Sequence, residues 1–144
     1  SVSADIPADA AAVLAKLLGV STVLEAALGF PLLLDKQLFV GVYPAGGPRY
    51  ERHLDKYDYE EMNMRTLTCL LYTNPGHDAT SNSNQGGELR VYPPAKGLPV
   101  STGASSTFSK DILPIANRLV CFWSRTVFHE VLPVSAAAPP RFAV

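Results

Sequence analysis

Short apolar runs separated by clusters of Gly, Pro, Asn and Ser follow one another from residue 38 to the end of the chain. Runs of this length that are rich in Val, Leu and aromatic residues are typical of strands joined by loops. The expected strands cover 38–43, 50–55, 65–72, 88–92, 118–123, 129–133 and 141–144.

The first part of the chain has a different pattern. Residues 8–28 are rich in Ala and Leu, and their larger apolar side chains recur at about helical spacing. Asp9 is a candidate cap for the start of a helix, and Gly19 followed by Ser21 is a point where the stretch could divide into two short helices. We expect this segment to cover one face of a sheet.

Strands that follow a helical start, without strand–helix alternation, predict a mainly antiparallel β fold. The expected fold class is therefore mainly β, a double-stranded β-helix (jelly roll) with an N-terminal supporting helix or helices. At 144 residues the chain is long enough for one hydrophobic core, so we expect a single domain over 1–144, with a helical start at 8–28 and a barrel core at 38–144.

Charge and composition narrow the classes of function. Twelve basic residues stand against 13 acidic ones, and the basic residues are scattered, which argues against binding to nucleic acid or a membrane surface. No apolar run reaches the roughly 20 residues of a membrane span. Cys69 and Cys121 lie in apolar runs and are expected as buried free thiols, with a disulfide as the alternative. Free thiols fit a cytoplasmic or nuclear protein.

Histidine and aspartate define a candidate metal site. His53 and Asp55 are two residues apart in an expected strand, so their side chains point to the same face. His129, in another expected strand, can supply a third ligand. Two histidines and one carboxylate on one face of an octahedron leave positions for a bidentate co-substrate and O2, which suits non-haem Fe(II) chemistry.

Simpler interpretations exist for each of these residues. An H-x-D triplet is weak evidence by itself, because Asp55 could be a solvated carboxylate and His129 a half-buried histidine with ordinary partners. The remaining histidine, His77, lies in a polar Gly- and Asn-rich loop and is expected to face solvent rather than a metal.

Arg141 is a candidate anchor for a carboxylate. It begins the last expected strand after a Pro-Pro pair, and its guanidinium can form a two-pronged pair that Lys cannot. Tyr72 closes another expected strand and could donate a hydrogen bond to the same carboxylate. A dicarboxylic keto acid could then chelate iron at one end and contact Arg141 and Tyr72 at the other. A surface arginine is the simpler interpretation of Arg141 alone.

Taken together, these segments resemble the prolyl 4-hydroxylases among the Fe(II)- and 2-oxoglutarate-dependent oxygenases, above all the hypoxia-inducible-factor (Egl-nine type) enzymes. The matching segments are VYPAGGPRYERHLD (42–55), RTLTCLLYTN (65–74), GGELRVYP (86–93), RLVCFWS (118–124) and HEVLPV (129–134). Their order agrees with the family from about residue 38 to the end.

The resemblance implies a role for each candidate residue. It makes His53, Asp55 and His129 the iron ligands, and Arg141 with Tyr72 the binding residues for the distal carboxylate of 2-oxoglutarate. Tyr43 matches an active-site tyrosine near the co-substrate. Two further residues match positions near the peptide-binding mouth: Arg65 and Tyr50.

There are departures from the family pattern. The spacing from His129 to Arg141 is longer than usual, so 135–140 (SAAAPP) is interpreted as a loop insertion before Arg141. The chain also lacks the early strands and the final strand of the family. We therefore expect a catalytic domain that is incomplete at both ends.

The implied activity is hydroxylation of a prolyl residue in a protein substrate to 4-hydroxyproline, with succinate and CO2 as co-products. Its expected requirements are Fe(II), 2-oxoglutarate and O2, with ascorbate as reductant, and it could sense oxygen. One alternative is the same chemistry on another side chain or on a small molecule. Others are a cupin-like metal-binding domain without catalysis, and a protein-interaction module that uses KYDYEEMN (56–63).

Overall fold

The structure is a computed structural model that describes residues 8–34, 38–57, 62, 64–74, 85–94 and 108–144. The chain divides into two compact units, 1–38 and 39–144. The expectation of one domain over the whole chain therefore stays a prediction.

The described residues of the first unit include one helix, α1 (Ala8–Leu28), which runs through Gly19, so the division into two short helices there is wrong. A glycine inside a helix costs only about 1 kcal/mol relative to alanine, and Ala- and Leu-rich segments lie before it and again from Leu24 to the end of the helix. Gly29 ends the helix in the left-handed conformation, with φ 77°, and its N–H donates to the carbonyl of Glu25 at 2.9 Å. In the described part of the chain, no helix has the length and apolarity needed to cross a bilayer.

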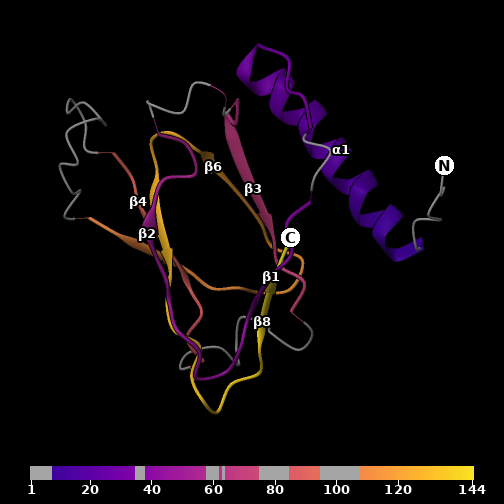
Figure 1. The fold of residues 1–144 in the computed structure, drawn as a ribbon. Helices are drawn as coiled ribbons and strands as arrows, with labels where there is room; N and C mark the ends of the chain where they lie inside the picture. The colour runs from indigo at the N-terminus through magenta and orange to yellow at the C-terminus, as the bar shows by residue number, and fades with distance from the viewer. Residues whose placement is uncertain (1–7, 35–37, 58–61, 63, 75–84, 95–107) are drawn as a thin grey trace. The chain divides into compact units, whose positions relative to one another are not determined.

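The second unit is built from short antiparallel strands (Figure 1). Their bounds are β1 Gly41–Tyr43, β2 Tyr50–His53, β3 Leu67–Leu71, β4 Leu89–Tyr92, β5 Lys110–Ile112, β6 Leu119–Trp123, β7 Phe128–Val131 and β8 Arg141–Ala143. Each strand expected from the sequence is present with fewer residues than expected, and β7 begins one residue earlier than predicted. The strand β5 was not expected.

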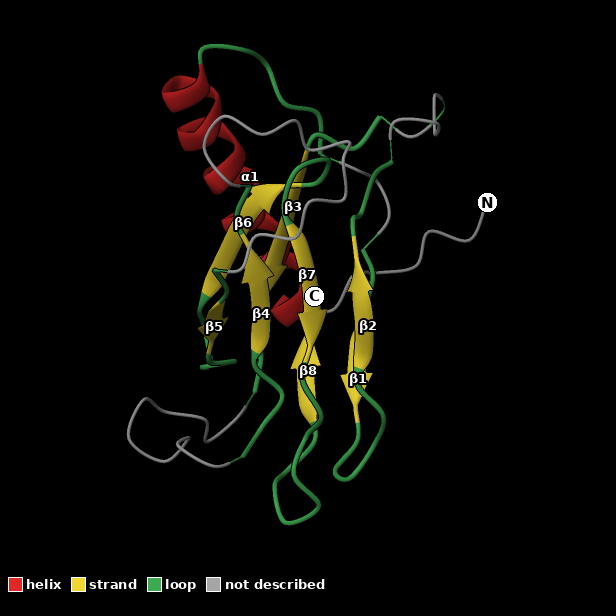
Figure 2. Ribbon diagram, turned by 90° about the vertical axis from the view of Figure 1, so that its left-hand side faces the viewer, coloured by secondary structure: helices red, strands yellow, loops and turns green. Residues whose placement is uncertain are grey.

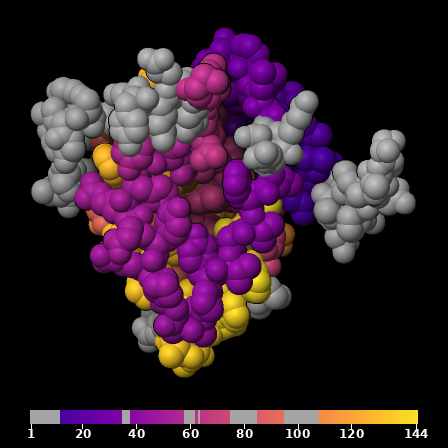
Figure 3. Space-filling view, in the orientation of Figure 1, coloured from indigo at the N-terminus to yellow at the C-terminus, as the bar shows by residue number. Residues whose placement is uncertain are grey.

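The strands form three antiparallel sheets in the described residues (Figure 2). One sheet has the order β2-β7-β4-β5, and two further pairs are β1-β8 and β3-β6. Neighbours in each ladder come from distant parts of the sequence, as in the pairing of β1 with β8. The space-filling view accordingly shows the segment of β1 and β2 beside the C-terminal segment (Figure 3).

The core of this unit lies between the four-stranded sheet and the β3-β6 pair. Leu89, Val91 and Val131 from the sheet pack with Phe122 from β6, and each is at most 8% exposed. Alternate residues of each strand share a face, so the residues next to these in sequence point outward. Polar side chains of the candidate site occupy other positions on or next to five of the strands: β2, β3, β6, β7 and β8.

Candidate metal centre

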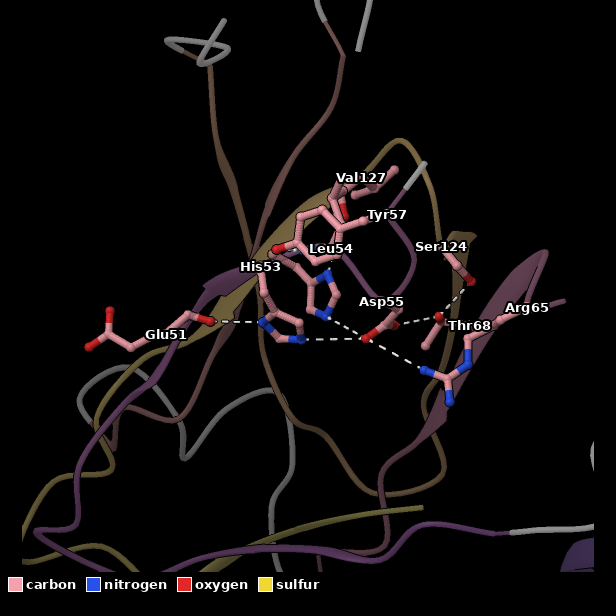
Figure 4. Close-up of polar contacts among 10 residues, drawn as sticks. Glu51, His53, Leu54, Asp55, Tyr57, Arg65, Thr68, Ser124 and Val127 are labelled. Carbon is pink, nitrogen blue, oxygen red and sulfur yellow. Dashed lines mark hydrogen bonds and ion pairs between the residues drawn. The ribbon is translucent and has the colours of Figure 1, made fainter. Parts of the chain in front are cut away.

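Two paired strands bring the two candidate histidines together. His53 ends β2 and lies directly opposite His129 of β7 in the antiparallel register. Their ring centroids are 4.3 Å apart. Asp55 lies beyond the end of β2, not in the strand as the sequence predicted, and its carboxylate still turns to the histidine side (Figure 4).

The three side chains converge on one point. Oδ1 of Asp55 is 3.4 Å from Nε2 of His53 and 3.6 Å from Nε2 of His129. One ligand atom from each residue lies within 4.8 Å of the others. At 3.4 and 3.6 Å, Oδ1 of Asp55 is close enough to each Nε2 for a cation at about 2 Å to contact the carboxylate and an imidazole together. The set of two imidazole nitrogens and one carboxylate oxygen suits a divalent transition metal.

Backbone carbonyls orient both imidazole rings for metal binding. Nδ1 of His53 lies 2.8 Å from the carbonyl of Glu51, and Nδ1 of His129 lies 3.1 Å from the carbonyl of Val127. Because a carbonyl can only accept, each Nδ1 must carry the hydrogen. In the neutral ring Nε2 then has a free lone pair, and this is the nitrogen directed at Asp55.

A chain of hydroxyl groups orients the Asp55 carboxylate. Thr68 of β3 donates from Oγ1 to Oδ2 of Asp55 at 2.5 Å. Thr68 has one hydroxyl hydrogen, so Ser124, whose Oγ is 2.8 Å away, must donate to Thr68 in turn. Ser124 is fully buried. Oδ2 is thus occupied, and Oδ1 remains directed at the two histidines.

The electrostatics of the centre favour a negative Asp55. Burial raises the pKa of the Asp55 carboxyl, but hydrogen bonds with His53 and Thr68 outweigh burial, and the pKa is lowered overall. The hydrogen bond with Asp55 raises the pKa of His53, whereas burial lowers the pKa of His129. Arg65 adds positive charge, with Nη1 3.8 Å from Oδ1 of Asp55.

A buried arginine lies on the strand pair β1-β8. Arg141 begins β8, pairs with Tyr43 of β1 and is 2% exposed. Its Nη2 donates to the hydroxyl of Tyr72 at 3.2 Å, and its guanidinium lies 4.5 Å from the centre of the Tyr43 ring. Within the described part of the chain, Nε and Nη1 of Arg141 have no hydrogen-bond partner. A buried cation with two free donors fits an anionic ligand, above all a carboxylate.

The Tyr72 phenol is suited to the same ligand. It is fully buried, and burial raises its pKa above the ordinary 10.0, so the hydroxyl keeps its hydrogen at neutral pH. Because Tyr72 accepts from Arg141, its own hydrogen is available for a carboxylate.

Residues far away in sequence hold the strand β8 in place through hydrogen bonds and packing. The buried side chain of Asn74 donates to the carbonyl of Pro114 at 2.7 Å and accepts from the backbone N–H of Phe142. Gly87 is in the left-handed conformation, and an added Cβ would lie 3.1 Å from Cδ of Arg141, so a side chain here would strain the backbone and push against Arg141. These contacts fix the residue next to Arg141 and the space around its side chain.

Aromatic rings connect the two halves of the site. The Tyr43 ring, under Arg141, lies 6.5 Å from the Tyr50 ring, which in turn lies 4.7 Å from the His53 ring. Tyr50 is 52% exposed, so this part of the site faces solvent. Arg141 and the metal ligands are therefore linked through contacting side chains, with the buried end at Arg141.

The structure brings together every candidate residue that the sequence singled out, apart from His77, which lies outside the described residues. Of the KYDYEEMN segment, the described part ends at Tyr57 and resumes only at Met62. Sequence reasoning missed Thr68, Ser124 and Asn74. For Thr68 a signal existed, because it shares a strand face with Tyr72 in the period of two.

Comparison with known proteins identifies relatives for most of the second unit. The family profile described as 2OG-Fe(II) oxygenase superfamily matches residues 38–144. The hypoxia-inducible factor prolyl hydroxylase of Caenorhabditis elegans is 36% identical over 96 residues, or 66% of this chain and 11% of that protein. Egl nine homolog 1 of Homo sapiens is 36% identical over 106 residues, or 73% of this chain and 20% of that protein.

Solved structures agree with this result. A Pseudomonas putida prolyl-4-hydroxylase superposes with a TM-score of 0.67 at 28% identity, covering 99% of this chain and 65% of that one. A Trichoplax adhaerens prolyl hydroxylase, in complex with a hypoxia inducible factor peptide fragment, superposes with a TM-score of 0.53 at 33% identity, covering 72% and 39%. The predicted double-stranded β-helix is confirmed. The chain spans only about a ninth and a fifth of these two curated relatives.

Proposed function

Because the chain belongs to the 2OG-Fe(II) oxygenase superfamily, we propose that it is the catalytic part of a dioxygenase that hydroxylates a prolyl residue in a protein substrate. The product is 4-hydroxyproline, and succinate and CO2 are the co-products. The named prolyl hydroxylases among its relatives support this choice of substrate within the superfamily.

The observation that carries the proposal is the pairing of a metal centre with a buried, incompletely bonded guanidinium. A protein that bound metal for structure alone would have no need of the two free donors of Arg141. Removing a guanidinium from water costs several kcal/mol unless a ligand compensates it. A co-substrate with a carboxylate at the far end supplies that compensation.

Each residue has a defined part in this function. His53, Asp55 and His129 hold Fe(II), and the backbone carbonyls behind the histidines keep their Nε2 lone pairs on the metal side. Arg141 and Tyr72 bind the distal carboxylate of 2-oxoglutarate and so fix the direction in which its keto acid end points. Iron and 2-oxoglutarate, when bound, supply the O2 chemistry that hydroxylates a C–H bond.

Tyr43 and the exposed residues near His53 control the access of water and of the substrate peptide to the site. The Tyr43 ring covers the Arg141 guanidinium and keeps water from its face. Tyr50 and Arg65 lie on the open side of the metal ligands, where they contact the substrate peptide. An exposed aromatic ring and a half-exposed cation suit an extended peptide segment with apolar and acidic residues.

The test is succinate formation from 2-oxoglutarate by the chain with Fe(II), ascorbate and O2, in the presence of proline-containing peptides. Peptide-dependent turnover and a mass gain of one oxygen on proline are expected, and both should vanish in His129→Ala. Arg90→Lys is the matched control, because Arg90 lies on the outward face of β4 and pairs with Asp111. Turnover that no proline peptide stimulates would overturn the prolyl assignment and leave another side chain or a small molecule as the substrate.

A further inference from the structure

Two cysteines face each other on the side of the β3-β6 pair opposite to the metal centre. Cys69 and Cys121 are direct partners in the antiparallel register, and their sulfur atoms are 3.3 Å apart. Both are free thiols. The sequence predicted buried thiols, and this is wrong for Cys121, which is exposed, while Cys69 is half-buried. The chain contains no other cysteine.

The hydrogen-bond pattern places this pair where strands come closest. The N–H of Ser124 donates to Thr66, and the N–H of Tyr72 donates to Arg118, so these two residue pairs are hydrogen-bonded positions of the ladder. Hydrogen-bonded and non-hydrogen-bonded pairs alternate along antiparallel strands. The pair of Cys69 and Cys121 is therefore non-hydrogen-bonded, with an expected Cα separation of about 4.5 Å, which lies inside the range of disulfides.

The two thiols also differ in acidity. The hydrogen bond from Cys121 lowers the pKa of Cys69 to about 7, and the same contact raises the pKa of Cys121. At neutral pH a substantial fraction of Cys69 is the nucleophilic thiolate, with a neutral thiol in contact. One attacking sulfur and one adjacent resolving thiol is the arrangement that reversible oxidation requires.

We propose that Cys69 and Cys121 form an oxidative modification site that closes to a cross-strand disulfide within the chain when hydrogen peroxide is the oxidant. The Cys69 thiolate attacks one peroxide oxygen, the O–O bond breaks, and hydroxide leaves and takes up a proton. Cys121 then attacks the sulfur of the resulting sulfenic acid, the S–O bond breaks, and water leaves. The two thiols lose two electrons and two hydrogens, and one peroxide becomes two waters.

The site is separate from the proposed oxygenase activity. The neighbours of the cysteines in sequence, Thr68 and Phe122, point to the opposite face, where Thr68 binds Asp55 and the Phe122 ring lies 4.6 Å from the His129 ring. Disulfide formation can therefore be measured without iron, 2-oxoglutarate or substrate.

The experiment treats the reduced, metal-free chain with a small molar excess of hydrogen peroxide and measures intact mass and free thiols without reductant. The expected result is a loss of two hydrogens, simultaneous loss of both thiols, and one cross-linked peptide pair containing Cys69 and Cys121. Dithiothreitol should reverse all three changes, and the oxidised chain should unfold at higher urea concentration. Oxygen addition without a cross-link, or disulfides between chains, would overturn the proposal.

Two controls test whether disulfide formation depends on the folded placement of the two sulfur atoms or only on the presence of two thiols in the chain. Cys121→Ala should gain oxygen at Cys69 in place of losing hydrogens, because no resolving thiol remains. The wild-type chain oxidised in urea should close the disulfide more slowly than the folded chain, because unfolding separates the two sulfurs. Equal rates in the folded and unfolded chain would contradict a preformed pair, and this comparison needs no variant that folds.

Discussion

The hydroxyl of Thr68 donates to the one carboxylate oxygen of Asp55 that does not face the histidines. This contact selects which oxygen is offered to a metal. Ser124, the buried residue that follows β6, donates to the Thr68 hydroxyl in turn, so a chain of two hydrogen bonds ends on the metal ligand.

Replacing Thr68 by valine should weaken divalent metal binding about 10- to 100-fold, the usual effect of losing a partner behind a ligand. Valine keeps the shape but leaves the Asp55 oxygen and the Ser124 hydroxyl without their partner. Thr68→Ser retains the hydroxyl and should bind metal nearly as the wild type does. Titration of the metal-free chains with Co(II), followed by visible absorption, measures the metal affinity of the wild type and of both variants. A valine variant with wild-type affinity would show that the Thr68 hydroxyl does not orient Asp55 for metal binding.

Replacing Arg141 by methionine should weaken 2-oxoglutarate binding strongly without lowering the free energy of unfolding. The substitution removes a buried cation with two free donors, and such replacements are often neutral or stabilising. The binding loss should be about 2 kcal/mol or more, roughly 30-fold. Calorimetric titration with 2-oxoglutarate, in the presence of Mn(II), gives the affinity, and urea unfolding gives the stability. Arg90→Lys should leave the affinity unchanged, and an equal loss in both variants would speak against Arg141 as the anchor.

Replacing Gly86 by alanine should destabilise the barrel by about 1–3 kcal/mol. The residue has φ 71°, and an added Cβ would lie 2.1 Å from the carbonyl oxygen of Pro133. The matched control is Gly19→Ala, where an added Cβ meets nothing within 4 Å and the helix should gain about 0.5–1 kcal/mol. Urea unfolding of the two variants should therefore shift in opposite directions, and similar midpoints would contradict the placement of Gly86.

Alkaline pH should destabilise the chain in part through Tyr72. Burial raises the pKa of this phenol above its ordinary 10.0, so the folded state holds the proton more tightly than the unfolded state. The resulting stabilisation is complete below pH 10 and is lost as pH rises through the raised pKa. Tyr72→Phe should weaken this dependence of the urea midpoint on pH, whereas Tyr50→Phe, at an exposed ring, should not. A Tyr72→Phe profile that follows the wild type would count against this coupling.

The metal ligands could be predicted because their signal is local. His53 and Asp55 share a face through the two-residue period, and His129 begins another apolar run. The end of β2 at His53 could not be predicted, because the irregular register between Tyr50 and His53 is set by β7.

The residues that orient the ligands could not be predicted from local patterns. Thr68 is 13 residues from Asp55, and Ser124 is 56 residues from Thr68, so only the β3-β6 pairing brings them together. The strand β5 was missed for a similar reason. Of its three residues only Ile112 is apolar, and its pairing with β4 is reinforced by the ion pair of Arg90 with Asp111 at 2.7 Å.

The central claim is that one site binds a divalent metal through His53, Asp55 and His129 and a dicarboxylate through Arg141. The most direct measurement is anaerobic calorimetric titration of the chain with 2-oxoglutarate, with and without Fe(II). The account predicts that Fe(II) strengthens 2-oxoglutarate binding in the wild type, that His129→Ala loses this enhancement, and that Arg141→Met loses binding under both conditions. Binding of 2-oxoglutarate that is indifferent to Fe(II), or that survives in Arg141→Met, would contradict the account.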